Sequence, residues 1–287
     1  MGAISKLRAA QVYNRRILRW QLNNAPYLSG DTFSDLADYT YSKSCYRIRD
    51  FRSNRVKSEV VFVSGEDFDA FFSEINSFRS LKVLIVGNSD RDWNNFPYAL
   101  PTHVKSIFLQ NNSIDSPKFH SLPIGLENRR LGVNGLPSNF KKVIKARSRL
   151  EICCSRPLLT YISPTHESRE NLAIDFENVH YFDKRLNAVE YLQQISLHQF
   201  VICPRGNGVD THRFWESLYL NAYPIVLQSN WSKLLKNQLQ IPFVEVESWS
   251  SIKQTIEASN FNEFSSLEIS SLWANYWRSK IRSELQA

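Results

Sequence analysis

The chemically richest part of the chain is the segment from residue 200 to residue 219. It begins with an apolar run that predicts a buried strand, and from Thr211 it continues into a pattern that predicts a helix. Glycines between the two let the backbone approach a ligand closely, and the amides of a helix's first turn point outward. Arginine side chains there suit phosphate, and a carboxylate on the same helix face suits ribose hydroxyls. We therefore expect this segment to bind a phosphorylated ligand through Arg205, Gly206, Asn207, Gly208, Asp210, Thr211, His212, Arg213 and Glu216.

Each of these residues also fits an ordinary structural role. Asp210 fits a helix N-cap, the glycines fit a turn, and Arg213 with Glu216 fits a surface ion pair of little energy. Their concentration in one strand-to-helix loop favours a binding site over these separate roles. The segment is not a Walker loop, because no G-K-[ST] follows, and its glycine spacing differs from the dinucleotide fingerprint G-x-G-x-x-G.

Strand and helix patterns alternate on both sides of this segment. Because helices that follow strands at this spacing indicate parallel sheets, we expect an α/β fold with two Rossmann-like domains. The domains are predicted at 1–130 and 151–287, joined by a linker at 131–150, with ligands bound in the cleft between them. Strands are predicted at 59–63, 82–86, 106–109, 120–124, 158–162, 179–182, 200–204, 223–227 and 243–246. Helices are predicted at 66–78, 166–176, 185–195, 211–221 and 231–235, and in a long last helix where Trp273, Trp277, Ile281 and Leu285 recur every fourth residue.

The run RGNGVDTHRFWESLYLNAYPIV, which begins at Arg205, resembles the donor-binding segment of exostosin-type glycosyltransferases. That family carries the pattern P-R-G-x-G-x-D-[ST]-x-R-x-W-E-x-L-x-x-G-x-[IP]-P-[IV]-V. A weaker likeness extends to α-1,3-fucosyltransferases, where a helix begins after an aspartate and leads to a similar Pro-Ile-Val strand. The chain departs from the family at 221–223, where Asn-Ala-Tyr replaces the usual glycine before the strand. The resemblance implies a GT-B fold, in which two Rossmann-like domains face each other across a cleft and a long C-terminal helix closes the chain.

The resemblance also implies roles for single residues. Arg213 would pair with the diphosphate of a nucleotide sugar, helped by the 206–208 amides and by Arg205, and Glu216 would hold the ribose. Thr165 and Arg169 resemble a further family position near the phosphates, although 163–165 also fits a plain helix start. GT-B enzymes usually neutralise the leaving diphosphate without a metal. We therefore expect no cofactor and no metal, with the nucleotide sugar as a substrate.

An inverting transfer needs a base that takes the proton of the acceptor hydroxyl, and in this fold the base normally comes from the first domain. Candidates after first-domain strands are Asp90, with Asp92 beside it, and Glu127; Asp31 is a further candidate. The run Gln110-Asn111-Asn112 is suited to binding sugar hydroxyls. A retaining transfer would need no such base.

Charge and cysteine content bound the partners and the compartment. Thirty-five Lys and Arg against 28 Asp and Glu give a net charge of +7, which favours polyanionic partners. Basic and apolar residues mix in 1–20, which fits either a helix on anionic lipid or a solvated first helix. No apolar run suits a membrane span, no secretory signal is evident, and four cysteines form no C-x-x-C pair. We expect a cytoplasmic protein, which would be peripheral to the inner membrane face only if 1–20 forms the helix on anionic lipid.

Together these observations predict an enzyme that moves a sugar from a nucleoside diphosphate sugar to a carbohydrate or lipid-linked glycan acceptor. A UDP-sugar is favoured, and a GDP-fucose type of donor stays open because of the fucosyltransferase likeness. The alternative is a non-catalytic carbohydrate- or nucleotide-binding protein with a decayed site. Nucleic-acid binding is disfavoured, because beyond 1–20 the basic residues are dispersed instead of gathered in a stripe.

Overall fold

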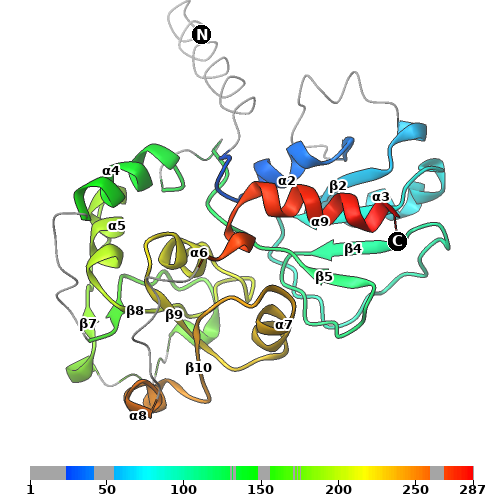
Figure 1. Ribbon diagram of the computed structural model, residues 1–287. Helices are drawn as coiled ribbons and strands as arrows, with labels where there is room; N and C mark the ends of the chain where they lie inside the picture. The colour runs from blue at the N-terminus through cyan, green and yellow to red at the C-terminus, as the bar shows by residue number, and fades with distance from the viewer. Residues whose placement is uncertain are drawn as a thin grey trace, which may run out of the picture.

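Two parallel β-sheets form the frame of the molecule (Figure 1). This computed structural model describes residues 24–41, 55–129, 131, 134–147, 156–170, 172, 174, 176–258 and 268–286. The strands are β1 (Tyr39–Tyr41), β2 (Val60–Ser64), β3 (Val83–Gly87), β4 (Ser106–Leu109), β5 (Phe119–Ser121), β6 (Leu158–Leu159), β7 (His180–Tyr181), β8 (Phe200–Ile202), β9 (Tyr223–Leu227) and β10 (Val244–Val246). The α-helices are α2 (Gly30–Leu36), α3 (Phe68–Glu74), α4 (Pro137–Arg147), α5 (Ala188–Leu197), α6 (His212–Tyr219), α7 (Asn230–Leu239), α8 (Ile252–Ala258) and α9 (Ala274–Gln286).

The first sheet runs in the order β1-β2-β3-β4-β5, and every neighbouring pair is parallel. Its central strands β2, β3 and β4 are largely apolar on both faces because both faces are covered. Val61 and Val63 of β2 pack in the core on the side of α3, whereas Val60 and Phe62 pack in the core on the other side, with α2 and α9. Successive residues point to opposite faces of a strand, so the unbroken Val60–Ser64 run supplies both cores.

The second sheet runs in the order β10-β9-β8-β6-β7, again with parallel neighbours. The order in which strands are added to the sheet reverses at β6: β7 lies on one side of β6, and β8, β9 and β10 lie on the other. The loops at the carboxyl ends of β6 and β8 therefore diverge and leave a crevice, which is where open α/β sheets bind ligands. The first sheet runs sequentially, so among its described strands no such reversal occurs.

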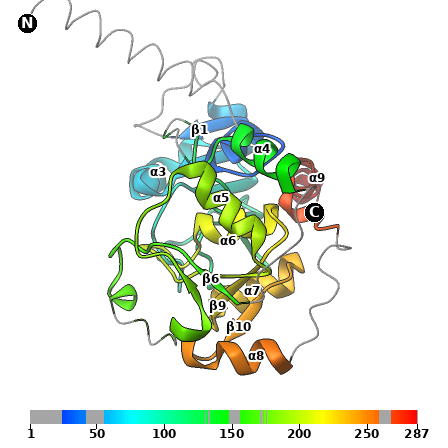
Figure 2. The ribbon, with the colours of Figure 1, turned by 90° about the vertical axis from the view of Figure 1, so that its left-hand side faces the viewer.

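The chain crosses more than once between the two sheets. Helix α4 falls within the expected linker 131–150 and packs along α5, as Figure 2 shows. Helix α9 returns to the first sheet, where it contacts α2 and β3, and the Trp277 ring lies 5.4 Å from that of Phe33. The last helix, which the sequence analysis placed with residues 151–287, thus covers the first sheet. The hydroxyl of Tyr219 joins two crossings, since it accepts from Leu28 N at 2.9 Å and donates to Leu272 O at 2.7 Å.

The α/β class and the parallel sheets are confirmed, while some elements differ from their prediction. The helix predicted at 166–176 is reduced to short 3₁₀ turns, η5 (Glu167–Arg169) and η6 (Phe176–Asn178). Helix α7 begins after the N-cap Ser229, which accepts from Ser232 N, and it continues beyond the predicted 231–235 to Leu239, where Gln240 ends it in the left-handed conformation. The basic stretch 1–20 lies outside the described residues. Within the described part of the chain, no helix has the length and apolar character needed to cross a bilayer.

Candidate functional site

A cleft of about 760 Å³ opens between β6 and β8, at the reversal of strand order in the second sheet. Residues of both domains line it. The second domain contributes the ends of β6 and β8, the first turn of α6 and the 185–191 region. The first domain contributes Asp90, Ile124 and Glu127. The cleft therefore lies at the switch point and between the two sheets, and its size is that of a small-molecule site.

Arg213 presents unused hydrogen-bonding capacity to this cleft. Its Nη2 donates to the carbonyl of Tyr161, which follows β6, at 2.9 Å. Its Nη1 is buried and has no hydrogen-bond partner among the described residues, and the same is true of Thr160 Oγ1. Buried donors without partners are costly, and both residues line the cleft. The arrangement fits a ligand that brings acceptor oxygens to Arg213.

Glu216 lies three residues further along α6, at the base of the cleft, and is only 3% exposed. Tyr191 of α5 donates its hydroxyl to Glu216 Oε2 at 2.7 Å. Burial raises the pKa of Glu216, and His212, Tyr191 and Arg213 oppose the rise. The carboxylate is thus fixed in orientation by a neighbouring helix, as a hydrogen-bond acceptor for a ligand should be.

The glycine loop before α6 is held against the first domain. Gly206 N donates to Gly208 O at 3.0 Å, which closes a tight turn. A Cβ on Gly208 would lie 2.7 Å from Asn111 Nδ2, so only glycine allows Asn111 to approach. Asn111 in turn accepts from Asp210 N at 2.8 Å and donates to Ser89 O at 2.9 Å. The loop is therefore positioned by a buried amide of the other domain.

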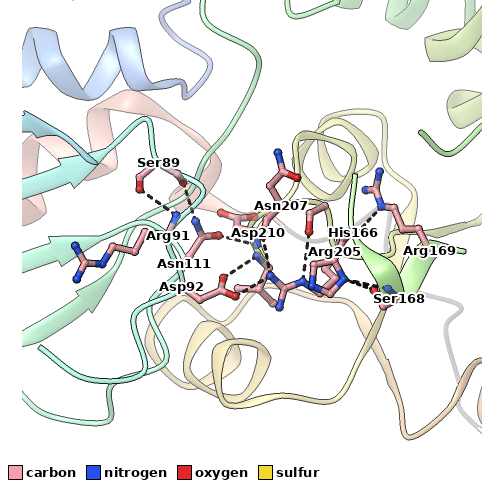
Figure 3. Close-up of polar contacts among 12 residues, drawn as sticks. Ser89, Arg91, Asp92, Asn111, His166, Ser168, Arg169, Arg205, Asn207 and Asp210 are labelled. Atoms are coloured by element: carbon pink, nitrogen blue, oxygen red, sulfur yellow. Dashed lines mark hydrogen bonds and ion pairs between the residues drawn. The ribbon is translucent and has the colours of Figure 1, made fainter. Parts of the chain in front are cut away.

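The Arg205 side chain contacts the first domain instead of pointing into the cleft. Its Nη2 donates to Asp92 Oδ2 at 2.7 Å and to Asn207 O at 2.7 Å, and Figure 3 shows the Asp92 and Arg205 side chains meeting from the two domains. Val209 N donates to the other oxygen of Asp92 at 3.1 Å. The sequence pattern placed Arg205 at the phosphates, whereas in the structure it forms an interdomain ion pair.

Arg169, like Arg205, is occupied by contacts within the protein, and Thr165 lies outside the cleft. The Arg169 guanidinium donates to three carbonyls, those of Ser163, Pro204 and Arg205, and so joins the loops after β6 and β8. Burial, and then Arg213, lowers the pKa of Arg169 to about 10. Arg169 lines the cleft, but Thr165 is exposed and does not, although its Oγ1 lies 3.8 Å from where a Gly206 Cβ would be. Arg169 is thus first a support of the loops.

Asp210 is a buried tie between the domains. Its Oδ2 accepts from Ile124 N at 2.8 Å, and its Oδ1 accepts from Trp215 Nε1 at 2.7 Å. The N-cap of α6 is Thr211, one residue later, and its side chain makes no capping bond. Burial raises the pKa of Asp210 to about 7, although both hydrogen bonds act in the opposite direction. With both oxygens occupied, Asp210 fixes α6 to the loop after β5.

Of the four carboxylates predicted as bases, Asp92 pairs with Arg205, and the other three lie in different places. Asp90 is exposed, lines the cleft and accepts from Asn207 Nδ2 at 3.1 Å. Glu127 also lines the cleft, and its Oε2 accepts from Asn134 N at 3.2 Å. Asp31 lies in the first turn of α2, accepts from Arg129 N at 2.9 Å and lines neither this cleft nor its neighbour. The structure therefore brings Asp90 and Glu127 to the cleft and leaves Asp31 outside it.

A smaller cavity of about 330 Å³ adjoins the cleft on the side of the first domain. It lies at the carboxyl ends of β2, β3 and β4, where Gly65, Asn88 and Gln110 line it. Its lining shares three residues with that of the cleft: Asp90, Ile124 and His212. His212 Nδ1 lies 2.7 Å from Gly125 O, so the imidazole is held at the boundary of the two spaces.

Sequence reasoning missed several residues that line the cleft. Tyr191, Arg185, Leu186, Asn187 and Ala188 come from the loop after β7 and the start of α5. The signal for them was present, since this loop follows the strand next to β6 and its carboxyl end must face the same crevice. No three His, Cys, Asp or Glu side chains among the described residues gather as a metal site would require.

No family model matches the chain, and no curated protein matches it in sequence.

Proposed function

We propose that this protein is a glycosyltransferase that moves a sugar from a nucleoside diphosphate sugar to a carbohydrate acceptor. The observation that carries the proposal is an unsatisfied donor: the buried Nη1 of Arg213 has no hydrogen-bond partner among the described residues, and Arg213 lines a cleft at the switch point of a parallel sheet. Diphosphate oxygens would satisfy that donor, and forked guanidinium hydrogen bonds suit them. The GT-B arrangement, with each domain lining one side of the cleft, belongs to this proposal.

Different residues of the cleft would bind different parts of the nucleotide sugar. Arg213 would bind the diphosphate and stabilise the charge that it gains as it leaves. Glu216, held by Tyr191, would accept from ribose hydroxyls. The exposed Arg185 at the rim adds a third guanidinium to those of Arg169 and Arg213. These cations supply the neutralisation for which other enzymes use a metal ion.

Calorimetric titration of the purified protein with UDP and with GDP, each in EDTA and in magnesium, tests the proposal. We expect micromolar binding of one nucleotide, with UDP favoured, and the same affinity in EDTA. Arg213→Ala should weaken it by about 2–4 kcal/mol, which is about 30- to 1,000-fold in Kd. Arg278→Ala, which removes an exposed arginine from α9, is the matched control and should bind as the parent does.

A second variant separates the nucleoside from the phosphates. Glu216→Gln keeps an oxygen that accepts from Tyr191, so the local fold should persist. The substitution should weaken the affinity for UDP and leave the affinity for inorganic pyrophosphate nearly unchanged. If the parent binds neither nucleotide, or if both variants bind UDP as the parent does, the cleft is not a nucleotide-sugar site.

A further inference from the structure

We propose that His212 is the base of the transfer reaction and takes the proton of an acceptor hydroxyl held in the smaller cavity. This inference rests on the proposed function and adds the residue that activates the nucleophile. It also places the base on α6 in the second domain, whereas the sequence analysis sought it among carboxylates of the first.

The hydrogen bond to Gly125 fixes the state of the imidazole. A carbonyl oxygen only accepts, so Nδ1, 2.7 Å from Gly125 O, carries the proton of the neutral ring. The lone pair is then on Nε2. Gly125 has φ +65°, and a Cβ there would lie 2.3 Å from Leu28 O, so this backbone position requires glycine. Its carbonyl is a fixed anchor that selects one tautomer of His212.

Position separates His212 from the other proton acceptors. Only three of the described residues line both spaces, and of these only Asp90 and His212 can take a proton. The Asp90 carboxylate is exposed and accepts from Asn207 Nδ2. Glu127 and Glu216 line the larger cleft alone. His212 is half-buried, and an imidazole is ordinarily a stronger base than a carboxylate.

The lining of the smaller cavity suits an uncharged polyol. Its side-chain amides come from Asn88, Gln110 and Asn128, and Asn128 Nδ2 donates to Asn88 Oδ1 at 2.7 Å. No lysine or arginine is among the described residues that line it, and its two carboxylates, Glu66 and Asp90, would repel an anion. Amides that both donate and accept match sugar hydroxyls. A neutral saccharide is therefore the acceptor class that fits.

The step balances with groups already named. The acceptor hydroxyl loses its proton to His212 Nε2 as its oxygen forms the new bond to the anomeric carbon. The bond from that carbon to the diphosphate oxygen breaks, and its electron pair leaves with the nucleoside diphosphate, next to Arg213. His212 ends as an imidazolium, and the anomeric configuration is inverted.

Histidine nitrogen NMR on the full chain tests this role even while the donor sugar is unidentified. The probes are methyl glycosides of glucose, galactose, mannose and N-acetylglucosamine, added to protein labelled with ¹⁵N-histidine and saturated with UDP. His212→Gln identifies the resonances of His212. We expect the neutral ring to carry its proton on Nδ1, and at least one glycoside to shift Nε2. Glu66→Ala should weaken the affinity for that glycoside about tenfold, which is the scale of one lost hydrogen bond. Glu257→Ala on α8 should leave that affinity unchanged.

The inference is overturned if the proton resides on Nε2, if a bound glycoside leaves Nε2 unmoved, or if none of the glycosides binds. A glycoside that binds is then tested as acceptor with UDP-glucose, UDP-galactose, UDP-N-acetylglucosamine and GDP-fucose, by release of UDP or GDP. His212→Gln should lower kcat about 100-fold or more and leave UDP affinity from calorimetry unchanged. A variant that turns over like the parent refutes the role of His212. If the parent protein releases neither UDP nor GDP, the proposed function is contradicted instead. The NMR result still tests the tautomer of His212 and its contact with the glycoside.

Discussion

Asp210→Asn tests how the two domains are held together, because Asp210 is the buried carboxylate between the loop after β5 and helix α6. Burial raises its pKa to about 7 from an ordinary value of 3.8. Between these values the folded state binds a proton that the unfolded state does not, so the free energy of unfolding falls as pH rises. A difference of about three pKa units corresponds to about 4 kcal/mol across this window.

Asparagine at this position keeps the shape and removes the titration. Its amide nitrogen must face either Ile124 N or Trp215 Nε1, so one donor meets another donor, at a cost of about 1–3 kcal/mol. We expect Asp210→Asn to be less stable than the parent near pH 4. The difference should then shrink by up to about 4 kcal/mol between pH 4 and pH 8, because the parent alone must ionise a buried group.

Urea unfolding of parent and variant at intervals over this pH range measures the difference directly. Asp183→Asn, which changes an exposed carboxylate in the loop after β7, is the control and should follow the parent at every pH. A difference that stays constant, or that grows in favour of the parent as pH rises, would show that the two hydrogen bonds outweigh burial. The reasoning about Asp210 would then be wrong.

Three further predictions concern single contacts. Arg213→Lys keeps the charge but replaces the guanidinium fork, whose separate nitrogens can reach Tyr161 O and a phosphate, by a single nitrogen, so UDP affinity should fall about tenfold by calorimetry. Gly208→Ala puts a Cβ 2.7 Å from Asn111 Nδ2 and should lower the free energy of unfolding by about 1–3 kcal/mol in urea. Burial lowers the pKa of His198, and His180 Nδ1 lies 2.8 Å from its Nε2. The folded state therefore resists protonation, and stability should be lost as pH falls below about 6.5, with a smaller loss in His198→Gln, by thermal unfolding at each pH.

The sequence was sufficient for what depends on neighbours along the chain. Strand β8, the glycine turn and α6 follow from one apolar run, two glycines and a helical period, and they bring Arg213 and Glu216 to one helix face. Glu216 and Arg213 were therefore found together with the space that they line. The amphipathic stripe of α9 predicted a buried face, but a stripe does not say which sheet covers it.

The roles that sequence reasoning could not assign depend on partners far along the chain. Arg205 and Asp92 are separated by 113 residues, and Asp210 and Ile124 by 86. A local pattern shows that Arg205 follows a strand, but it does not show that the carboxylate of Asp92 lies next to it in the folded protein. His212 is the same case, since the role that we propose for it depends on its hydrogen bond with Gly125, which packs against Leu28.

Helix α6 explains how one short segment can serve two spaces. Adjacent residues of a helix point in different directions, so His212 reaches Gly125 of the first domain while Arg213 reaches Tyr161 of the second. Asp210 ties the start of the helix to the first domain, and Tyr219 ties its end to the chain crossings. Loosening the first-domain ties would therefore displace His212 from its anchor and leave the Arg213 contact in place. Substitutions at that interface should slow transfer more than they weaken nucleotide binding, because the carbonyl that anchors His212 belongs to the first domain and the carbonyl that anchors Arg213 belongs to the second.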